Sequence, residues 1–176
     1  ANTMEPFIRD HGVSIVGGCC GTTPAHIKTL REKLKGVVPA PRDIDKGIFV
    51  SGPQEAVPID GSKGLVRIGE RLNVRGSKLI QEAVEKEEVI AMQVLEEVVS
   101  EQVKDLGMEI IDVCMDSNIV ETEEVLPKII HGLTSDFKGV MCIDSFSVEA
   151  LAKAIESYPG RPIINSISLE EYKKGE

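Results

Sequence analysis

Two adjacent cysteines in a glycine-rich run are the first residues of this 176-residue chain whose types could do chemistry. Cys19 and Cys20 lie in the sequence Gly-Gly-Cys-Cys-Gly, and the flanking glycines permit a turn sharp enough for both thiolates to face one ion. Thiolates are soft ligands that favour zinc and bind it only when deprotonated. Two thiolates do not complete a tetrahedron, and no other cysteine or histidine lies at zinc-finger spacing, so we expect a third ligand upstream of residue 1. A buried vicinal pair and a redox pair are the alternatives.

A second group of polar side chains lies where four expected buried strands end. Its members are Glu70 and Asn73 on the first strand, Asp112 and Asp116 on the second, Asp144 on the third and Asn165 on the fourth. The carboxyl ends of parallel strands meet at one edge of a sheet, where ligands bind in α/β proteins. At any single position a turn or cap role is the stronger explanation. Four consecutive strands that end this way favour a binding site.

These side chains depend on a unit of strand, turn and helix that repeats over residues 64–176. The pattern predicts strands at 65–69, 109–113, 140–143 and 162–167. It predicts helices at 78–106, with a break near 85–88, and at 122–132 and 147–157. Strands that alternate with helices imply parallel pairing and right-handed crossovers. The predicted fold class is therefore α/β.

The first part of the chain has a different organisation. Residues 1–36 predict the end of a helix, a short buried strand at 13–16, a turn, and a helix capped by Thr22 or Thr23 with Pro24 in its first turn. Residues 37–63 are rich in proline and glycine and lack a sustained period, which is typical of a linker. A short strand near 48–50 is the exception that we expect there.

Composition excludes several classes of partner. The net charge of -9 and an aromatic content of 3% argue against nucleic acid, which requires a basic face and stacking side chains. No apolar run approaches the roughly 20 residues of a membrane span, and no secretory signal is visible. Four cysteines do not make a disulfide framework, and Cys114 and Cys142 fall in expected buried strands. We therefore expect a reducing, cytoplasmic location without membrane contact.

Five segments carry a resemblance. Residues 16–27 read VGGCCGTTPAHI and residues 68–78 read IGERLNVRGSK, and residues 112–116, 143–145 and 164–168 follow at later strand ends. The first run is similar to the end of the homocysteine-binding domain of cobalamin-dependent methionine synthases. The others resemble, in the same order, strand ends of that family's methyltetrahydrofolate-binding domain. Alone, these later motifs are also similar to dihydropteroate synthases and to methyltetrahydrofolate–corrinoid methyltransferases.

The resemblance implies pieces of two TIM-type parallel β/α barrels. Residues 1–36 would be the C-terminal end of a homocysteine- and zinc-binding barrel, and residues 37–63 a linker. Residues 64–176 would be about the first four β/α units of a pterin-binding barrel. The isolated chain would then lack half of that barrel, and we expect it to be inactive. Cobalamin would be carried by a domain that this chain does not contain.

The same resemblance implies roles for the site residues. Cys19 and Cys20 match two of three cysteines whose zinc binds homocysteine as a thiolate. Asp112, Asp144 and Asn165 would contact the pterin of methyltetrahydrofolate. Asn165 would act catalytically beside N5, the methyl-bearing nitrogen. The pterin-side and loop contacts would come from Glu70 and Asn73.

One departure and two alternatives accompany this interpretation. The family usually has Asp-Val-Asn at the second strand, whereas this chain has Cys114 at the asparagine position. A thiol is a weak donor and acceptor, so one pterin contact should be lost or replaced by water. The alternatives are a stand-alone pterin methyltransferase or dihydropteroate synthase-like enzyme, and a non-catalytic truncated module. Such a module would expose an open barrel edge through which a second copy could pair.

Overall fold

The computed structural model describes residues 3–43, 46–86 and 88–167. The chain divides into two compact units, Ala1–Lys46 and Gly47–Glu176. The division falls inside the segment 37–63 that the sequence predicts as a linker. Each unit has its own secondary structure, and the site residues belong to both.

The described residues of the first unit form the helices α1 (Glu5–Arg9) and α2 (Pro24–Lys33). Thr23 is the N-cap of α2, and its backbone N–H donates to Nδ1 of His26 at 3.1 Å. The strand predicted at 13–16 is wrong: these residues form no regular secondary structure, and Ile15 is 89% exposed. An apolar run becomes a strand only when a neighbouring strand supplies its backbone hydrogen bonds. No strand of the described residues pairs with it.

The second unit is built on a parallel sheet in the order β3-β4-β5-β6. Its strands are β3 (Ile68–Asn73), β4 (Ile110–Cys114), β5 (Val140–Asp144) and β6 (Ile163–Asn165). The predicted α/β class with parallel pairing is confirmed. The first strand begins three residues later than expected: pairing with β4 starts at Ile68, and Leu65, which is 87% exposed, lies outside the sheet. Glu70 and Asn73 are therefore part of the strand and do not follow it. Ser168, the last residue of the fourth strand-end motif, lies outside the described residues.

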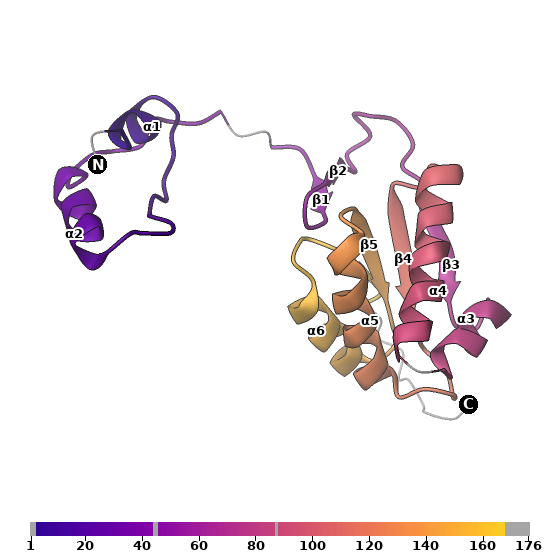
Figure 1. Ribbon diagram of the computed structural model, residues 1–176. Helices are drawn as coiled ribbons and strands as arrows, with labels where there is room; N and C mark the ends of the chain where they lie inside the picture. Colours follow the sequence, from indigo (N-terminus) through magenta and orange to yellow (C-terminus); the bar gives the residue numbers. More distant parts are fainter. Residues whose placement is uncertain (1–2, 44–45, 87, 168–176) are drawn as a thin grey trace. The chain divides into compact units, whose positions relative to one another are not determined.

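Helices cover one face of this sheet, as Figure 1 shows for α4, α5 and α6. The region predicted as one helix with a break is α3 (Lys78–Val84), α4 (Glu88–Ser100) and a π-helical turn, η1 (Glu101–Asp105). Glu87, within the predicted break, lies outside the described residues. The remaining helices are α5 (Thr122–Asp136) and α6 (Val148–Ser157). Ser147 caps α6 as expected, because its Oγ accepts the N–H of Ala150 at 3.3 Å. Among the described helices, none combines the length and apolarity needed to span a membrane.

The main core lies between the helices and the sheet. Strand residues at alternate positions point into it, among them Ile111, Val113, Met141 and Ile143, all 0% exposed. They pack against helix residues such as Leu126 and Ile130. Burial of each side chain of this size stabilises the fold by about 2 kcal/mol. Because side chains alternate along a strand, the intervening residues must face away from the helices.

A hairpin covers part of that opposite face. Strands β1 (Phe49–Ser51) and β2 (Ala56–Pro58) pair antiparallel within the predicted linker. Val50 packs with Ile110 and Val140, the first residues of β4 and β5. The Tyr158 hydroxyl donates to the Ser51 carbonyl at 3.0 Å, which ties the hairpin to the end of α6. The hairpin therefore covers the amino ends of the strands on the helix-free face.

Candidate functional site

The last residues of all four strands form one row across the sheet. Asn73 pairs in register with Cys114, Cys114 with Asp144, and Asp144 with Asn165. Each of these residues follows a strand residue whose side chain points into the helix-side core. Because successive side chains of a strand point to opposite faces, the side chains of the row point to the helix-free face. Three of the five predicted pterin contacts therefore lie side by side at the carboxyl edge.

Asp112 lies one step deeper on the same face, two residues before Cys114. It is only 4% exposed and pairs in register with Cys142. Burial raises the pKa of Asp112 because a carboxylate is poorly solvated there. Hydrogen bonds from Cys142 and from Asn165 oppose this rise, and the negative charge of Glu70 adds to it. Asp112 is thus an acceptor already oriented by two donors.

Asp144 is the second carboxyl group of this face. Burial, followed by repulsion from the charge of Asp112, raises the pKa of Asp144 to about 6. A hydrogen bond from the Cys114 thiol favours the ionised form and limits the rise. Two carboxyl groups held together in a poorly solvated place repel each other and gain from any ligand that donates N–H groups.

The two thiols on this face stay protonated. Burial raises the pKa of Cys114 to about 12, and it raises the pKa of Cys142 as well. Neutral thiols act as weak hydrogen-bond donors and are unreactive as nucleophiles. The sequence interpretation treated Cys142 only as a small hydrophobic residue and missed its contact with Asp112. Cys142 is two residues before Asp144 on the same strand, and this spacing indicates that both side chains share one face of the sheet.

Glu70 and Asn73 reach the same face in different ways. Glu70 is exposed, and its charge raises the pKa of Asp112 and of Asp144, so it lies near both carboxyl groups. The Asn73 Oδ1 accepts the backbone N–H groups of Arg75 at 3.0 Å and Gly76 at 3.1 Å. Asn73 therefore belongs to the row, but its side-chain carbonyl stabilises the following loop. This is the turn role that the sequence offers as the alternative to ligand binding.

Asp116 has a structural role. Its carboxylate accepts a hydrogen bond from the Ser145 hydroxyl at 2.7 Å and another from the Phe146 backbone N–H at 2.6 Å. Ser145 Oγ in turn accepts the N–H of Ser147, the N-cap of α6. Asp116 thereby joins the loop after β4 to the loop after β5 and fixes where α6 begins. It supports the carboxyl edge, and its negative charge also raises the pKa of Asp144 and of Cys114.

The cysteine pair lies in the first unit, on the turn before α2. Both residues are exposed, and their sulfur atoms are 3.8 Å apart. Hydrogen bonds from the backbone and then from the thiol of Cys20 lower the pKa of Cys19. Thr22 closes the turn, with its N–H 3.0 Å from the Cys19 carbonyl and its Oγ1 3.0 Å from the Cys19 N–H. A Cβ at Gly18 would overlap with the Thr22 side chain, so the close turn requires glycine there.

The pair alone is not a complete metal site. In the part of the chain that the structure describes, no group of three or more His, Cys, Asp or Glu residues could hold an ion. The described residues therefore offer two sulfur ligands in one turn.

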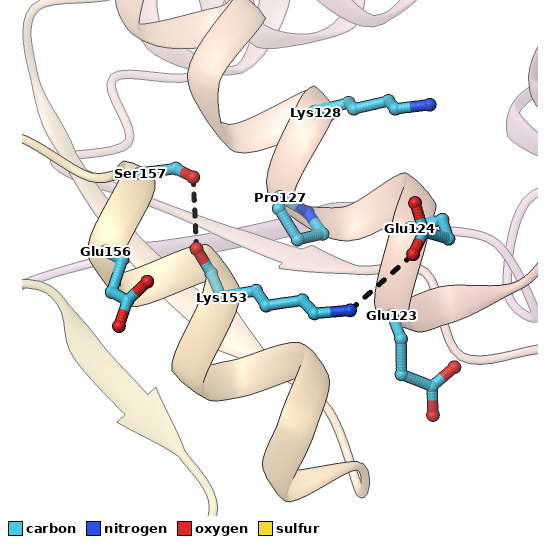
Figure 2. A pocket seen from close by; sticks show the side chains of 7 residues that line it. All are labelled: Glu123, Glu124, Pro127, Lys128, Lys153, Glu156 and Ser157. Carbon is cyan, nitrogen blue, oxygen red and sulfur yellow. Dashed lines mark hydrogen bonds and ion pairs between the residues drawn. The ribbon is translucent and has the colours of Figure 1, made fainter.

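A separate hollow of about 520 Å³ lies between α5 and α6 on the helix side (Figure 2). An ion pair of 3.5 Å between Lys153 Nζ and Glu124 Oε1 spans it. Its lining residues are Glu123, Glu124, Pro127, Lys128, Lys153, Glu156 and Ser157. No residue of the strand-end row is among them. The hollow is a charged helix–helix groove and is distinct from the candidate site.

Comparison with known proteins relates the two units to two families. Residues 69–176 match the family described as pterin binding enzyme, and residues 1–34 match homocysteine S-methyltransferase. The methionine synthase of Mycobacterium tuberculosis (strain ATCC 25618 / H37Rv) is 30% identical over 175 residues, covering 97% of this chain and 14% of its own length. The methionine synthase of Mycobacterium leprae (strain TN) is 29% identical over 180 residues, with the same shares of 97% and 14%. The chain thus spans about one seventh of the length of these relatives.

The raised pKa of Asp144 predicts a pH-dependent gain in stability from Asp144→Asn. An unfolded aspartate has a pKa of about 3.9, so the folded chain binds the extra proton between pH 4 and 6. Stability must fall as the pH rises through that window. Asparagine avoids the loss, and the variant should be more stable by about 1–2 kcal/mol at pH 7 and unchanged at pH 4, allowing for solvent screening. Urea denaturation at both pH values measures this.

The exposed Asp136 on α5 offers a matched control. Asp136→Asn should change the free energy of unfolding by less than about 0.5 kcal/mol at either pH. An Asp144→Asn variant that loses stability at pH 7 would show that burial and the charge of Asp112 do not disfavour the ionised form of Asp144.

Proposed function

The chain belongs to the family of pterin-binding enzymes, and we propose that it is the part of a methionine synthase that joins a homocysteine-binding domain to a methyltetrahydrofolate-binding domain. The observation that carries this proposal is the order of the two family matches. They fall in separate compact units, at residues 1–34 and 69–176. The parent protein would be a methyltransferase that forms methionine and tetrahydrofolate.

The proposed architecture is two partial barrels. Residues 1–36 would end the homocysteine barrel, and residues 64–176 would begin the pterin barrel. The linker would be 37–63, which includes the β1–β2 hairpin. A parallel sheet with its described helices on one face supports the barrel, because an open doubly wound sheet carries helices on both faces. The helix-free face would be the barrel interior, and the hairpin would cover its amino end.

The pterin would bind at the strand-end row. A pterin presents an amide-like edge and an exocyclic amine, so it needs acceptors and donors in one plane. Asp112 and Asp144 supply acceptors, and Asn165 supplies both kinds of group. Ring N–H groups would offset the poor solvation and the repulsion that raise the pKa of Asp144. Binding would therefore lower that pKa and release a proton near pH 6.

Asn165 would act at N5. Methyl transfer from a tertiary amine is slow until the nitrogen is protonated, because a neutral amine leaves more readily than an amide anion. An amide hydrogen bond that strengthens as N5 gains its proton stabilises the transition state more than the ground state. The hydrogen bond between Asn165 and Asp112 would hold the amide ready for this role. The proposed methyl acceptor is a corrinoid bound to another domain or protein. This corrinoid would carry the methyl group to homocysteine.

The geometry of the cysteine pair fits zinc. A tetrahedral zinc ion with Zn–S bonds of about 2.3 Å places two sulfur ligands about 3.8 Å apart. The sulfur atoms of Cys19 and Cys20 are 3.8 Å apart, and the pKa of Cys19 is lowered. We propose that the pair supplies two of three thiolates, the third lying outside the described residues. Zinc would supply a Lewis acid that lowers the pKa of the homocysteine thiol.

The alternatives are less well supported. A stand-alone pterin methyltransferase or dihydropteroate synthase-like enzyme does not account for the homocysteine S-methyltransferase match at residues 1–34. A truncated, self-associating module is favoured only by the two edges of the described sheet, β3 and β6. A second copy pairing through one of these edges would make the size of the chain in solution depend on its concentration.

Replacing the proposed catalytic amide tests the function directly. In the full-length protein, Asn165→Ala should lower kcat for methyl transfer from methyltetrahydrofolate about 100-fold, because proton transfer to N5 loses its hydrogen bond. Asn118→Ala alters an exposed asparagine and should leave kcat unchanged. Steady-state kinetics would refute the assignment if both variants turned over equally fast.

The Cys114 position offers a gain-of-binding test. Cys114→Asn introduces an amide into the row between Asn73 and Asp144, where the resemblance implies asparagine. The affinity of the full-length protein for methyltetrahydrofolate should rise about threefold to tenfold, the effect of one hydrogen bond. Calorimetric titration measures it. Unchanged or weaker binding would mean that no pterin atom lies opposite this position.

Removing one thiolate tests the zinc proposal. Cys20→Ser should lower the zinc content of the full-length protein well below one ion per chain, because serine is a poor ligand for zinc. Cys142→Ser alters a thiol of the second unit and should leave zinc content unchanged. Elemental analysis after dialysis decides the matter, and equal zinc in the two variants would exclude the Cys19–Cys20 turn.

A further inference from the structure

Strand β3 contains one more residue than its neighbour between two matched positions. Gly69 pairs with Ile111, and Leu72 pairs with Val113. Two residues of β3 therefore lie opposite a single residue of β4. This arrangement is a β-bulge, in which the extra residue is left out of the hydrogen-bond ladder and side chains are re-aimed.

The bulge places two of the proposed contacts on one face. Glu70 and Asn73 are three residues apart, so regular alternation would direct them to opposite faces of the sheet. With the extra residue, Asn73 pairs with Cys114 in the strand-end row, and the charge of Glu70 still acts on Asp112. Without it, either Glu70 or Asn73 would face the helix-side core.

A buried glutamine holds the bulge. Gln102 is 1% exposed and lies on the π-helical turn η1, where the wider turn accommodates one extra residue. Its Oε1 accepts a hydrogen bond of 3.0 Å from the backbone N–H of Arg71, one of the two bulge residues. The neighbouring Glu101 forms an ion pair of 2.5 Å with the Arg71 side chain. The π-helical turn η1 thus makes two contacts with Arg71 of the bulge, one to its backbone and one to its side chain.

The space for this contact depends on glycine. A Cβ at position 69 would lie 2.5 Å from Gln102 Oε1, so any other residue there would displace the amide. The Nε2 of Gln102 has no hydrogen-bond partner among the described residues, although it is buried. An unpartnered buried amide is unfavourable to folding. Its presence indicates that the carbonyl end of Gln102 has a role that a hydrophobic residue of the same size would not fill.

We infer that Gln102 is a positioning residue for the strand-end site. It accepts the backbone N–H of Arg71 and so maintains the bulge that brings Glu70 and Asn73 to the same face. This inference rests on the proposed function, since it takes methyltetrahydrofolate as the ligand of that face. Gln102 itself lies on the helix side and does not touch the ligand.

The test uses Gln102→Met in the full-length protein. Methionine keeps the length of the side chain and removes the acceptor, so the Arg71 amide should exchange its hydrogen faster. The KM for methyltetrahydrofolate should rise about fivefold with kcat unchanged, because contacts on the pterin side are lost and those at N5 remain. A purely structural role would instead reduce the fraction of folded enzyme, which lowers kcat and leaves KM unchanged. Gln93→Met, at an exposed position on α4, is the matched control.

A second variant covers the case in which Gln102→Met does not fold. Gly69→Ala displaces the Gln102 carbonyl by a single methyl group and should raise KM in the same direction. Unchanged exchange at Arg71, or an unchanged KM in a folded variant with faster exchange, would overturn the inference. A wild-type protein that neither binds nor uses methyltetrahydrofolate would refute the proposed function instead, and the exchange of Arg71 would still report whether Gln102 holds the bulge.

Discussion

The register of the parallel strands is the constraint on which the candidate site depends. Cys114, Asp144 and Asn165 end their strands at one level because β4, β5 and β6 pair without an offset. Side chains alternate with a period of two, so a slip of one residue would turn a whole strand over. That slip would bring Asp144 into the helix-side core and expose Ile143, which is now 0% exposed. Packing of the apolar face against the helices therefore fixes the register of the strands. The same register determines which polar side chains lie together on the opposite face.

The same register makes the site unfavourable in the absence of a ligand. It holds Asp112 and Asp144 close enough that the charge of one raises the pKa of the other. Each carboxyl group has a thiol donor beside it, Cys142 for Asp112 and Cys114 for Asp144. Thiols are weak donors, so they orient the carboxyl groups without neutralising the repulsion. The burial and mutual repulsion of the two carboxyl groups therefore lower the stability of the fold when both are ionised.

Sequence reasoning found the strand ends and missed the irregularities. Apolar runs bounded by polar residues located β4, β5 and β6 to within about two residues, which placed Asp144 and Asn165 correctly at one edge and Asp112 two residues too close to it. The bulge in β3 and the π-helical turn η1 have no pattern of their own, because each is one residue inserted into a regular element. The run at 13–16 looked like a strand because local composition says nothing about a pairing partner. Asp116 and Asp112 were equivalent in sequence, and only the hydrogen bonds of Asp116 to the next loop distinguish its role.

The four cysteines show how the surroundings decide the chemistry of one residue type. On the exposed turn, hydrogen bonds from Cys20 lower the pKa of Cys19, which favours a thiolate ligand. On the sheet, burial raises the pKa of Cys114 to about 12, so that sulfur keeps its proton. A protonated thiol can donate to Asp144, as an asparagine at this position would, although more weakly. Cysteine at this position therefore makes the same hydrogen bond to Asp144 that an asparagine amide would make, but it lacks the carbonyl acceptor of asparagine.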